Sequence, residues 1–174
     1  MANDLVESET AASFKESRFR PMVEYLHKVF TLDSQKRVGI IMTESPSLNL
    51  IHEMIACEAS LSKETITGGF LNSVEFKSVM EATGIVYGRE IYFDSIVQYG
   101  FTEIRKQAKI MKERYDIEVC IVEDIRVTPI DPIEPNVIDS RMKLPNGLEM
   151  LARELGIPVA ASNIDEGVIE YFPE

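Results

Sequence analysis

The stretch I-E-V-C-I-V-E-D-I, residues 117–125, most constrains how this chain of 174 residues can fold. It is apolar on both faces and too short for a core helix, which predicts a strand buried inside a sheet. Similar apolar runs occupy residues 38–42, 91–94 and 157–162, and segments with helical spacing of apolar residues separate them. This alternation predicts a single α/β domain with a mostly parallel sheet and helices on both faces.

Helices are predicted where apolar residues recur every three or four positions. They cover residues 19–30, 46–59, 74–83, 102–115 and 148–155. In the third of these, Phe76, Val79 and Met80 are expected to form the inward face. A fifth strand, at residues 168–172, is expected at an edge of the sheet.

Two connections are predicted from their turn-forming residues. Residues 62–73 contain Gly68-Gly69 and predict a turn-rich connection. Residues 126–146 contain four prolines and predict a long, stiff loop. The polar residues 1–13 predict a flexible N-terminal segment, which leaves residues 14–174 as one domain.

Composition narrows the classes of function. The net charge of −11 argues against direct gripping of a nucleic-acid backbone, which depends on clustered Lys and Arg. One basic face, formed by Arg105, Lys106, Lys109, Lys112 and Arg114, is available for an acidic partner. We expect it to be mainly a solvated face paired with Glu103 and Glu113.

Apolar runs, the N-terminal residues and the cysteines together predict the cellular compartment. No apolar run approaches the roughly 20 residues that span a bilayer, and the polar N-terminus does not resemble a secretory signal. Cys57 and Cys120 lie in apolar periodic segments, which predicts reduced core thiols. A cytoplasmic protein without a membrane segment is therefore expected.

Glu123 and Asp124 end the central apolar run and are the first candidates for chemistry. In an open parallel sheet, ligands gather at the carboxyl ends of the strands. The simpler interpretation is that these carboxylates are solvated where the strand leaves the sheet.

Several segments, in order, resemble the RecA-like motor domain of DnaB-type replicative DNA helicases. V-G-I-I-M-T-E-S-P resembles the family's strand that ends in S-L-E-M-P, and I-T-G-G-F-L-N-S-V-E-F resembles I-x-x-G-x-L-x-x-x-x-W. E-I-Y-F-D-S is similar to the strand M-Y-I-D-D, and residues 102–116 are similar to the helix before Walker B. Residues 151–163 resemble L-A-K-E-L-x-V-P-V-x-x-L-S-Q. The resemblance implies a three-layer RecA-like fold.

The resemblance also implies roles for individual residues. Glu44 falls at the glutamate that activates the attacking water. Glu123 falls at the Walker B position that holds magnesium, with Asp124 beside it, and Asn163 falls at the residue that senses the γ-phosphate. Lys15 is the one residue near the position of the phosphate-binding lysine.

The chain departs from the family's pattern at the phosphate cradle. A P-loop requires G-x-x-x-x-G-K-[ST], but this sequence has no Gly-Lys pair, and residues 11–17 contain no glycine. No Lys or Arg follows Arg153 to act as a basic finger on a neighbour's nucleotide. The segments expected to line a DNA channel, residues 126–146 and 163–167, are acidic and rich in proline.

These departures favour a non-catalytic relative of the helicase motor that acts through protein contacts, with a helicase subunit or with itself. In this hypothesis no cofactor is expected. One alternative is an active or partly active ATPase with a divergent site for ATP and Mg²⁺. A second is a RecA-like fold reused for another ligand or a divalent metal held by Glu44, Glu123 and Asp124.

Overall fold

The computed structural model describes residues 19–42, 48–96, 100–123, 140–163 and 167–173, and only the backbone of residues 140–146 and Asn163. Helices and strands alternate along much of the chain. In order they are α2 (Arg20–Leu32), β1 (Val38–Met42), α3 (Leu48–Ala59), α4 (Lys63–Gly68), α5 (Ser73–Gly88), β2 (Ile91–Ser95), α6 (Phe101–Tyr115), β3 (Val119–Glu123), α7 (Ser140–Leu155), β4 (Val159–Asn163) and β5 (Gly167–Tyr171).

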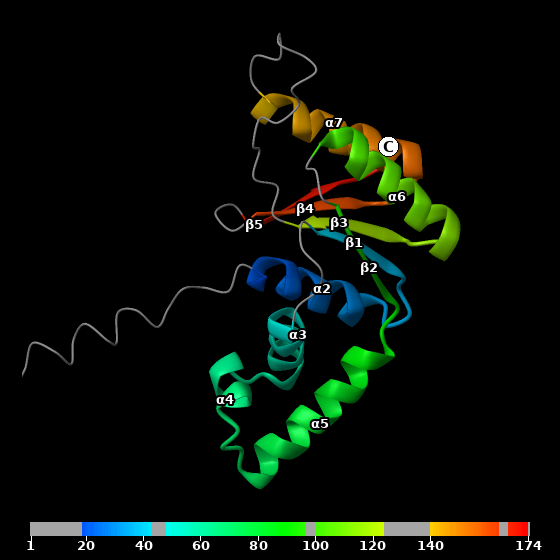
Figure 1. Cartoon of the computed structure of the whole chain (residues 1–174). Helices are drawn as coiled ribbons and strands as arrows, with labels where there is room; N and C mark the ends of the chain where they lie inside the picture. The colour runs from blue at the N-terminus through cyan, green and yellow to red at the C-terminus, as the bar shows by residue number, and fades with distance from the viewer. Residues whose placement is uncertain (1–18, 43–47, 97–99, 124–139, 164–166, 174) are drawn as a thin grey trace, which may run out of the picture.

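The five strands form one sheet in the order β2-β1-β3-β4-β5. The first four are parallel, and β5 pairs antiparallel with β4 at the edge. Figure 1 shows α6 and α7 on one face of the sheet and α2 and α3 on the other, with α4 and α5 farther out beyond α3. The predicted three-layer α/β fold and the edge position of the fifth strand are confirmed.

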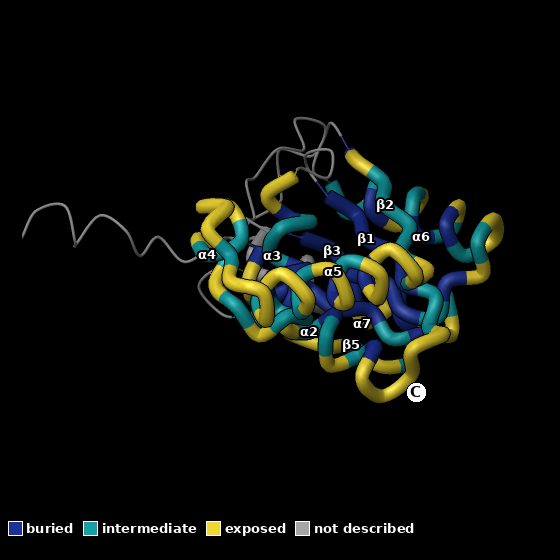
Figure 2. Tube along the Cα trace, turned by 90° about the horizontal axis from the view of Figure 1, so that it is seen from below, coloured by how far each residue is buried: buried dark blue, intermediate teal, exposed yellow. Residues whose placement is uncertain are grey.

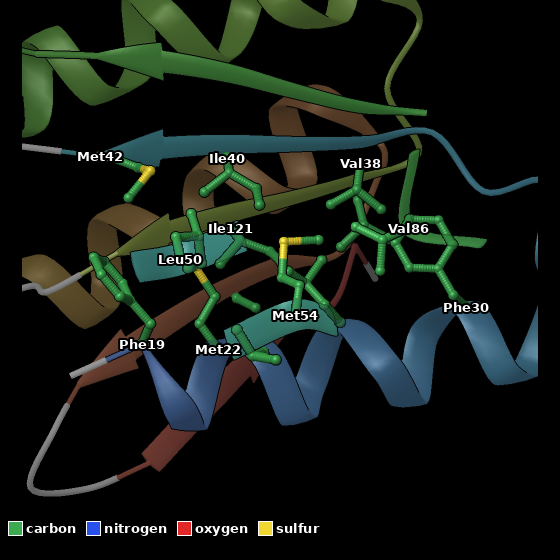
Figure 3. Packing of buried hydrophobic residues seen from close by; sticks show 14 of the residues in the cluster. Phe19, Met22, Phe30, Val38, Ile40, Met42, Leu50, Met54, Val86 and Ile121 are labelled. Carbon is green, nitrogen blue, oxygen red and sulfur yellow. The ribbon is translucent and has the colours of Figure 1, made fainter. Parts of the chain in front are cut away.

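The central strands β1 and β3 are buried along their whole length, which explains why both read as continuous apolar runs. Alternate residues of each strand enter different cores. Ile40 and Ile121 belong to the core on the side of α2, together with Met22, Leu26 and Phe30, and Figure 3 shows Phe30 beside Val86 in this core. Ile41 and Val122 face α6 and α7.

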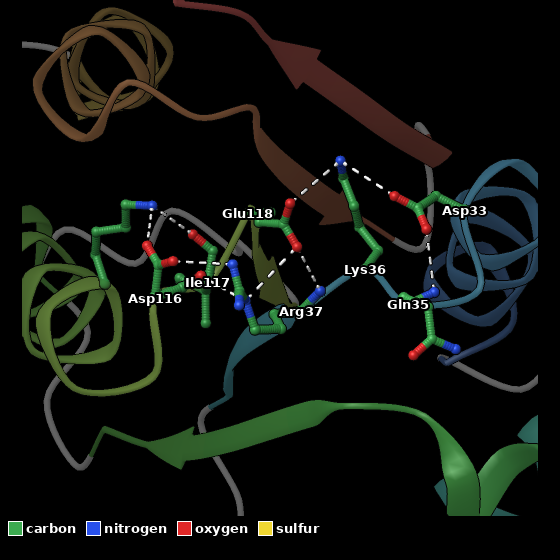
Figure 4. Close-up of polar contacts among 8 residues, drawn as sticks. Asp33, Gln35, Lys36, Arg37, Asp116, Ile117 and Glu118 are labelled. Atoms are coloured by element: carbon green, nitrogen blue, oxygen red, sulfur yellow. Dashed lines mark hydrogen bonds and ion pairs between the residues drawn. The ribbon is translucent and has the colours of Figure 1, made fainter.

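At the amino ends of β1 and β3, a network of charged side chains joins the two strands (Figure 4). Arg37 donates to the Asp116 carboxylate at 2.9 Å and to its carbonyl at 3.0 Å, while the Arg37 backbone N–H donates to Glu118 at 3.1 Å. Lys112 binds Asp116 from α6 at 2.8 Å. This hydrogen bond, together with the charges of Lys112 and Arg37, lowers the pKa of Asp116.

Two cations of the basic face of α6 pair with a carboxylate of α7 while remaining partly exposed to solvent. Arg105 donates two hydrogen bonds of 2.7 Å to the Glu154 carboxylate, and Lys109 pairs with the same group. Lys106 pairs with Glu103, as expected. Two of the five cations in the predicted basic patch therefore hold the two helices on this face together.

The C-terminal end of α5 is anchored by a cation. Arg89 follows the helix and contacts Glu58 of α3 at 2.5 Å, and its guanidinium lies 4.7 Å from the centre of the Phe30 ring. Elsewhere along α5, Ala82 and Val86 are the buried side chains and Val79 is partly buried against the same core. Figure 2 shows long exposed stretches over α4 and α5.

Three sequence predictions about helices were wrong. Residues 62–73 contain α4, because Ser62 caps its first turn by accepting the Thr65 N–H and Gly69, at φ 73°, ends it. The loop predicted to extend to residue 146 ends earlier, since the backbone is helical from Ser140. In α5, Phe76 and Met80 are exposed rather than inward-facing, and Val79 is partly buried.

The structure bears on two further predictions, the state of the cysteines and the lack of a membrane-spanning segment. Both cysteines are free, Cys120 is buried and Cys57 is half-buried. Burial raises the pKa of Cys120 to about 12, so this thiol is unreactive in the folded protein. Over the ranges that the structure describes, none of the helices has the length and apolar character needed to cross a bilayer.

We predict that Glu154→Gln weakens the α6–α7 contact at neutral pH and that its effect fades in acid. Hydrogen bonds from Arg105 and Lys109 lower the pKa of Glu154 to about 2, from an ordinary value of 4.5. The carboxylate therefore stabilises the fold above pH 4.5, and this contribution disappears as pH falls toward about 2. Thermal unfolding from pH 7 to 2 should show the wild type and variant converging. Glu149→Gln, which removes a neighbouring α7 carboxylate, is the control, and a pH-independent difference would contradict the prediction.

Candidate functional site

The carboxyl edge of the sheet brings together the ends of four parallel strands. Register pairs Met42 of β1 with Ser95 of β2, and Glu123 of β3 with Ser162 of β4. Because side chains alternate along a strand, Met42, Glu123 and Ser162 share the face covered by α2 and α3. This edge is where ligands bind in open parallel sheets.

Glu123 and Ser162 are buried polar residues at this edge, with exposed fractions of 1% and 2%. They are neighbours across the β3–β4 pair. A buried carboxylate is costly unless its surroundings are polar, and Ser162 on the neighbouring strand makes this corner of the sheet polar. Glu123 is the last residue of β3, the strand predicted from the sequence, and Ser162 of β4 lies beside it.

The N-terminus of α2 also lies at this edge, and Figure 3 shows Phe19 at the same end of the sheet as Met42. A helix N-terminus in this position is a potential anion site, because its first N–H groups point out of the helix. Here Phe19 is buried in the core and takes the N-cap position without a side-chain cap. Pro21 in the first turn has no N–H to offer.

The structure does not describe the side chains of the other predicted site residues. Glu44, Asp124 and Lys15 lie outside the described residues. Asn163 is described by its backbone, which pairs with Gly167 of β5. The predicted grouping of Glu44, Glu123 and Asp124 therefore stays a prediction. Within the described ranges, no three His, Cys, Asp or Glu residues are grouped so that they could hold a metal ion.

Sequence reasoning missed two contributors to this edge. The sequence predicts Phe19 as the first residue of a helical stripe, and its place beside the strand ends depends on the path of α2 over the sheet. It predicts Ser162 as the end of a strand. Its inward direction follows from alternation with the apolar residues Ala160 and Ala161, so the signal was present.

The fold and this edge narrow the class of protein. A mostly parallel sheet covered by helices on both faces (Figure 1), with a buried acidic residue at the end of a central strand, is an arrangement that RecA-like domains share with other α/β folds. The model of the DnaB-like helicase C terminal domain family matches residues 20–167. The chain belongs to this family, and the resemblance seen in the sequence is confirmed.

Individual relatives agree with the family assignment. The replicative DNA helicase DnaB of Nostoc sp. is 23% identical over 132 residues, which are 75% of this chain and 15% of the relative. DnaB of Treponema pallidum is 25% identical over 119 residues, 68% of this chain and 27% of the relative. The chain thus spans well under a third of either relative's length.

Solved structures share the fold. One of them, described as an ATPase domain, superposes with a TM-score of 0.57 at 17% identity, covering 74% of this chain and 47% of that one. A DnaB-like replicative helicase, described with its interactions with primase, gives the same TM-score and identity and is covered over 32% of its length. At 17% sequence identity, this structural similarity shows a shared fold.

We predict that Phe19→Ala destabilises the protein by about 3 kcal/mol, because it empties a buried aromatic site between α2 and the strand ends. Chemical denaturation followed by circular dichroism measures the change. Phe172→Ala, which removes an exposed ring after β5, should change stability by less than about 0.5 kcal/mol. Equal effects of the two substitutions would show that Phe19 is not a core residue.

Proposed function

We propose that this chain is a DnaB-like domain that does not turn over ATP and acts through protein contacts in DNA replication or a related process. The observation that carries the proposal is the N-terminus of α2. In the family pattern, the phosphate-binding loop immediately precedes this helix, and in this chain a buried Phe19 and a proline in the first turn stand there.

The first turn of α2 fits a triphosphate poorly. Phosphate cradles are built from successive backbone N–H groups, a lysine and a hydroxyl at a helix N-terminus. Pro21 removes one of those N–H groups, and the seven residues 11–17 contain no glycine to let the backbone approach a phosphate closely. We infer that nucleotide binding is lost and that no cofactor is required.

Burial of Glu123 supports the same proposal. Magnesium in nucleotide sites keeps several waters and takes phosphate oxygens as ligands. A carboxylate that is 1% exposed leaves little room for a hydrated ion. In this proposal Glu123 is a structural remnant of the Walker B position rather than a metal ligand.

Protein partners suit the surface better than DNA does. The net charge is −11, and Arg105 and Lys109 of the α6 basic face both pair with Glu154. A relative with this fold is described with its interactions with primase, which supports protein contact as a use of the fold. A helicase subunit and a second copy of this chain are the partners we propose.

The first experiment tests nucleotide binding. We expect titration calorimetry with ATP and Mg²⁺ to show no binding at micromolar concentrations, and we expect no phosphate release above the blank. The physical reason is the proline in the first turn of α2 together with the sequence of residues 11–17, which contains no glycine. A P-loop-containing DnaB-like ATPase domain is the positive control.

A second arm separates the alternatives. Micromolar ATP binding with turnover that Glu44→Gln abolishes would establish an active ATPase instead. Binding of Mg²⁺ or Mn²⁺ without nucleotide, lost in Glu123→Gln, would establish a reused metal site. In our proposal neither metal changes the melting temperature of the wild type or of Glu123→Gln.

A further inference from the structure

Strand β5 lies at the edge of the sheet opposite β2 and pairs along one side with β4 (Figure 1). Among the strands that the structure describes, none lies on its other side. The edge of a sheet presents backbone N–H and C=O groups with which another extended chain can pair. The family match ends at residue 167, where β5 begins, so this outer edge is a feature that the match does not include.

The two edges of the sheet differ in their side chains. On β2, Tyr92 stacks on Tyr115 with ring centroids 4.3 Å apart, and Phe93 packs against the core on the side of α2. On β5, Ile169 is 42% exposed, and Phe172, directly after the strand, is 57% exposed. A strand added beside β5 would therefore cover apolar side chains that are now in contact with water, which favours β5 over β2 as a binding edge.

Successive side chains of β5 point to opposite faces of the sheet. Tyr171 packs against the core beneath α6 and α7, and Ile169, two residues earlier, shares its face. Val168 packs against the core on the side of α2, and Glu170 shares that face. The edge thus offers apolar contacts on one face and a carboxylate on the other.

Glu170 is exposed, and within the described ranges no Lys, Arg or His side chain pairs with it. Its neighbour on α2 is Tyr25. Burial, the larger cause, and the charge of Glu170 raise the pKa of Tyr25 to about 12, so the phenol is neutral at physiological pH. Among the described residues, the carboxylate is left for a cation that a partner would bring.

We propose that the outer edge of β5 binds an extended segment of a partner protein in which a lysine or arginine stands between two apolar residues. The segment adds a strand to the sheet, with its apolar side chains beside Ile169 and Tyr171 and its basic side chain beside Glu170. The proposal rests on the proposed function, since it names how this chain holds a protein partner.

Charge disfavours a second copy of β5 as the occupant. Two antiparallel copies centred on Glu170 would place the two carboxylates directly opposite each other. Copies centred on Ile169 would place them diagonally on the same face. Like charges opposite each other destabilise a pair of strands, so a segment with a basic residue complements this edge better.

Selection of short random peptides from a displayed library, with the full chain as the target, tests the proposal. We expect the enriched peptides to alternate apolar residues around a lysine or arginine and to bind with micromolar dissociation constants. Ile169→Lys should weaken their binding at least ~5-fold, because it removes an apolar neighbour and adds a like charge. Ile85→Lys is the matched control, since it makes the same change at a 48% exposed isoleucine of α5. Circular dichroism establishes that both variants are folded.

Charge reversal tests the pairing with Glu170. Glu170→Lys should weaken binding of the original peptides at least ~5-fold, and selection against this variant should enrich aspartate or glutamate in place of the basic residue. Glu113→Lys reverses an exposed carboxylate of α6 and is the control. The control should keep the preference for basic peptides.

Amide hydrogen exchange followed by NMR tests whether the backbone takes part. In an antiparallel pair, every second residue of β5 directs its N–H toward β4, and the residues between direct theirs to the outer edge. A bound peptide that extends the sheet should slow exchange at these alternate outer amides. A peptide held by side chains alone would leave no such alternation.

Three results would overturn the proposal. They are a selection that enriches no peptide, enriched peptides that bind Ile169→Lys and Glu170→Lys as well as they bind the wild type, and exchange protection confined to other elements. Sedimentation showing a dimer that Ile169→Lys abolishes would assign the edge to a second copy instead. ATP binding would overturn the proposed function and leave the peptide test unaffected, whereas failure of the peptide test would leave the absence of ATP turnover unaffected.

Discussion

The parallel pairing of β1 with β3 is the interaction on which the rest of the structure depends. Both strands are buried throughout, so their backbone groups must be satisfied by each other and by the strands beside them. The pairing runs from Val38 opposite Val119 to Ile41 opposite Val122. Arg37 binds both Asp116 and Glu118 where the two strands enter the sheet, so charge reinforces the register that backbone hydrogen bonds set. The strand ends that form the candidate site are aligned by the same register.

The sheet could be predicted because strands buried on both faces leave a simple pattern of short continuous apolar runs. The helices on one side could not be predicted equally well. In α5 apolar residues occur on two faces, and periodicity alone does not say which face is covered. In α7 the backbone is helical through Pro145, so the local preference of proline is overridden there. In α4 the Ser62 cap was present in the sequence, but the following glycines favoured a turn.

The candidate site was predicted where a strand ended in a carboxylate, as for Glu123. One residue of the site was missed because its place depends on the path of a helix over the sheet. Phe19 is adjacent to the strand ends because α2 begins at the carboxyl edge and runs along the face of the sheet (Figure 3), and no spacing in the sequence encodes that path. Glu44, Asp124 and Lys15 lie in segments outside the described residues, so their roles still rest on the resemblance to the DnaB-like family.

The limited burial of α5 has a consequence for the dynamics of the chain. With Ala82 and Val86 as its buried side chains and Arg89 holding one end, α5 has fewer contacts to lose on local unfolding than β1 or β3. Its amides should therefore exchange with solvent through openings of lower free energy than those of the central strands. Any partner that covers the exposed face would slow this exchange, which makes the local stability of α5 dependent on the concentration of that partner.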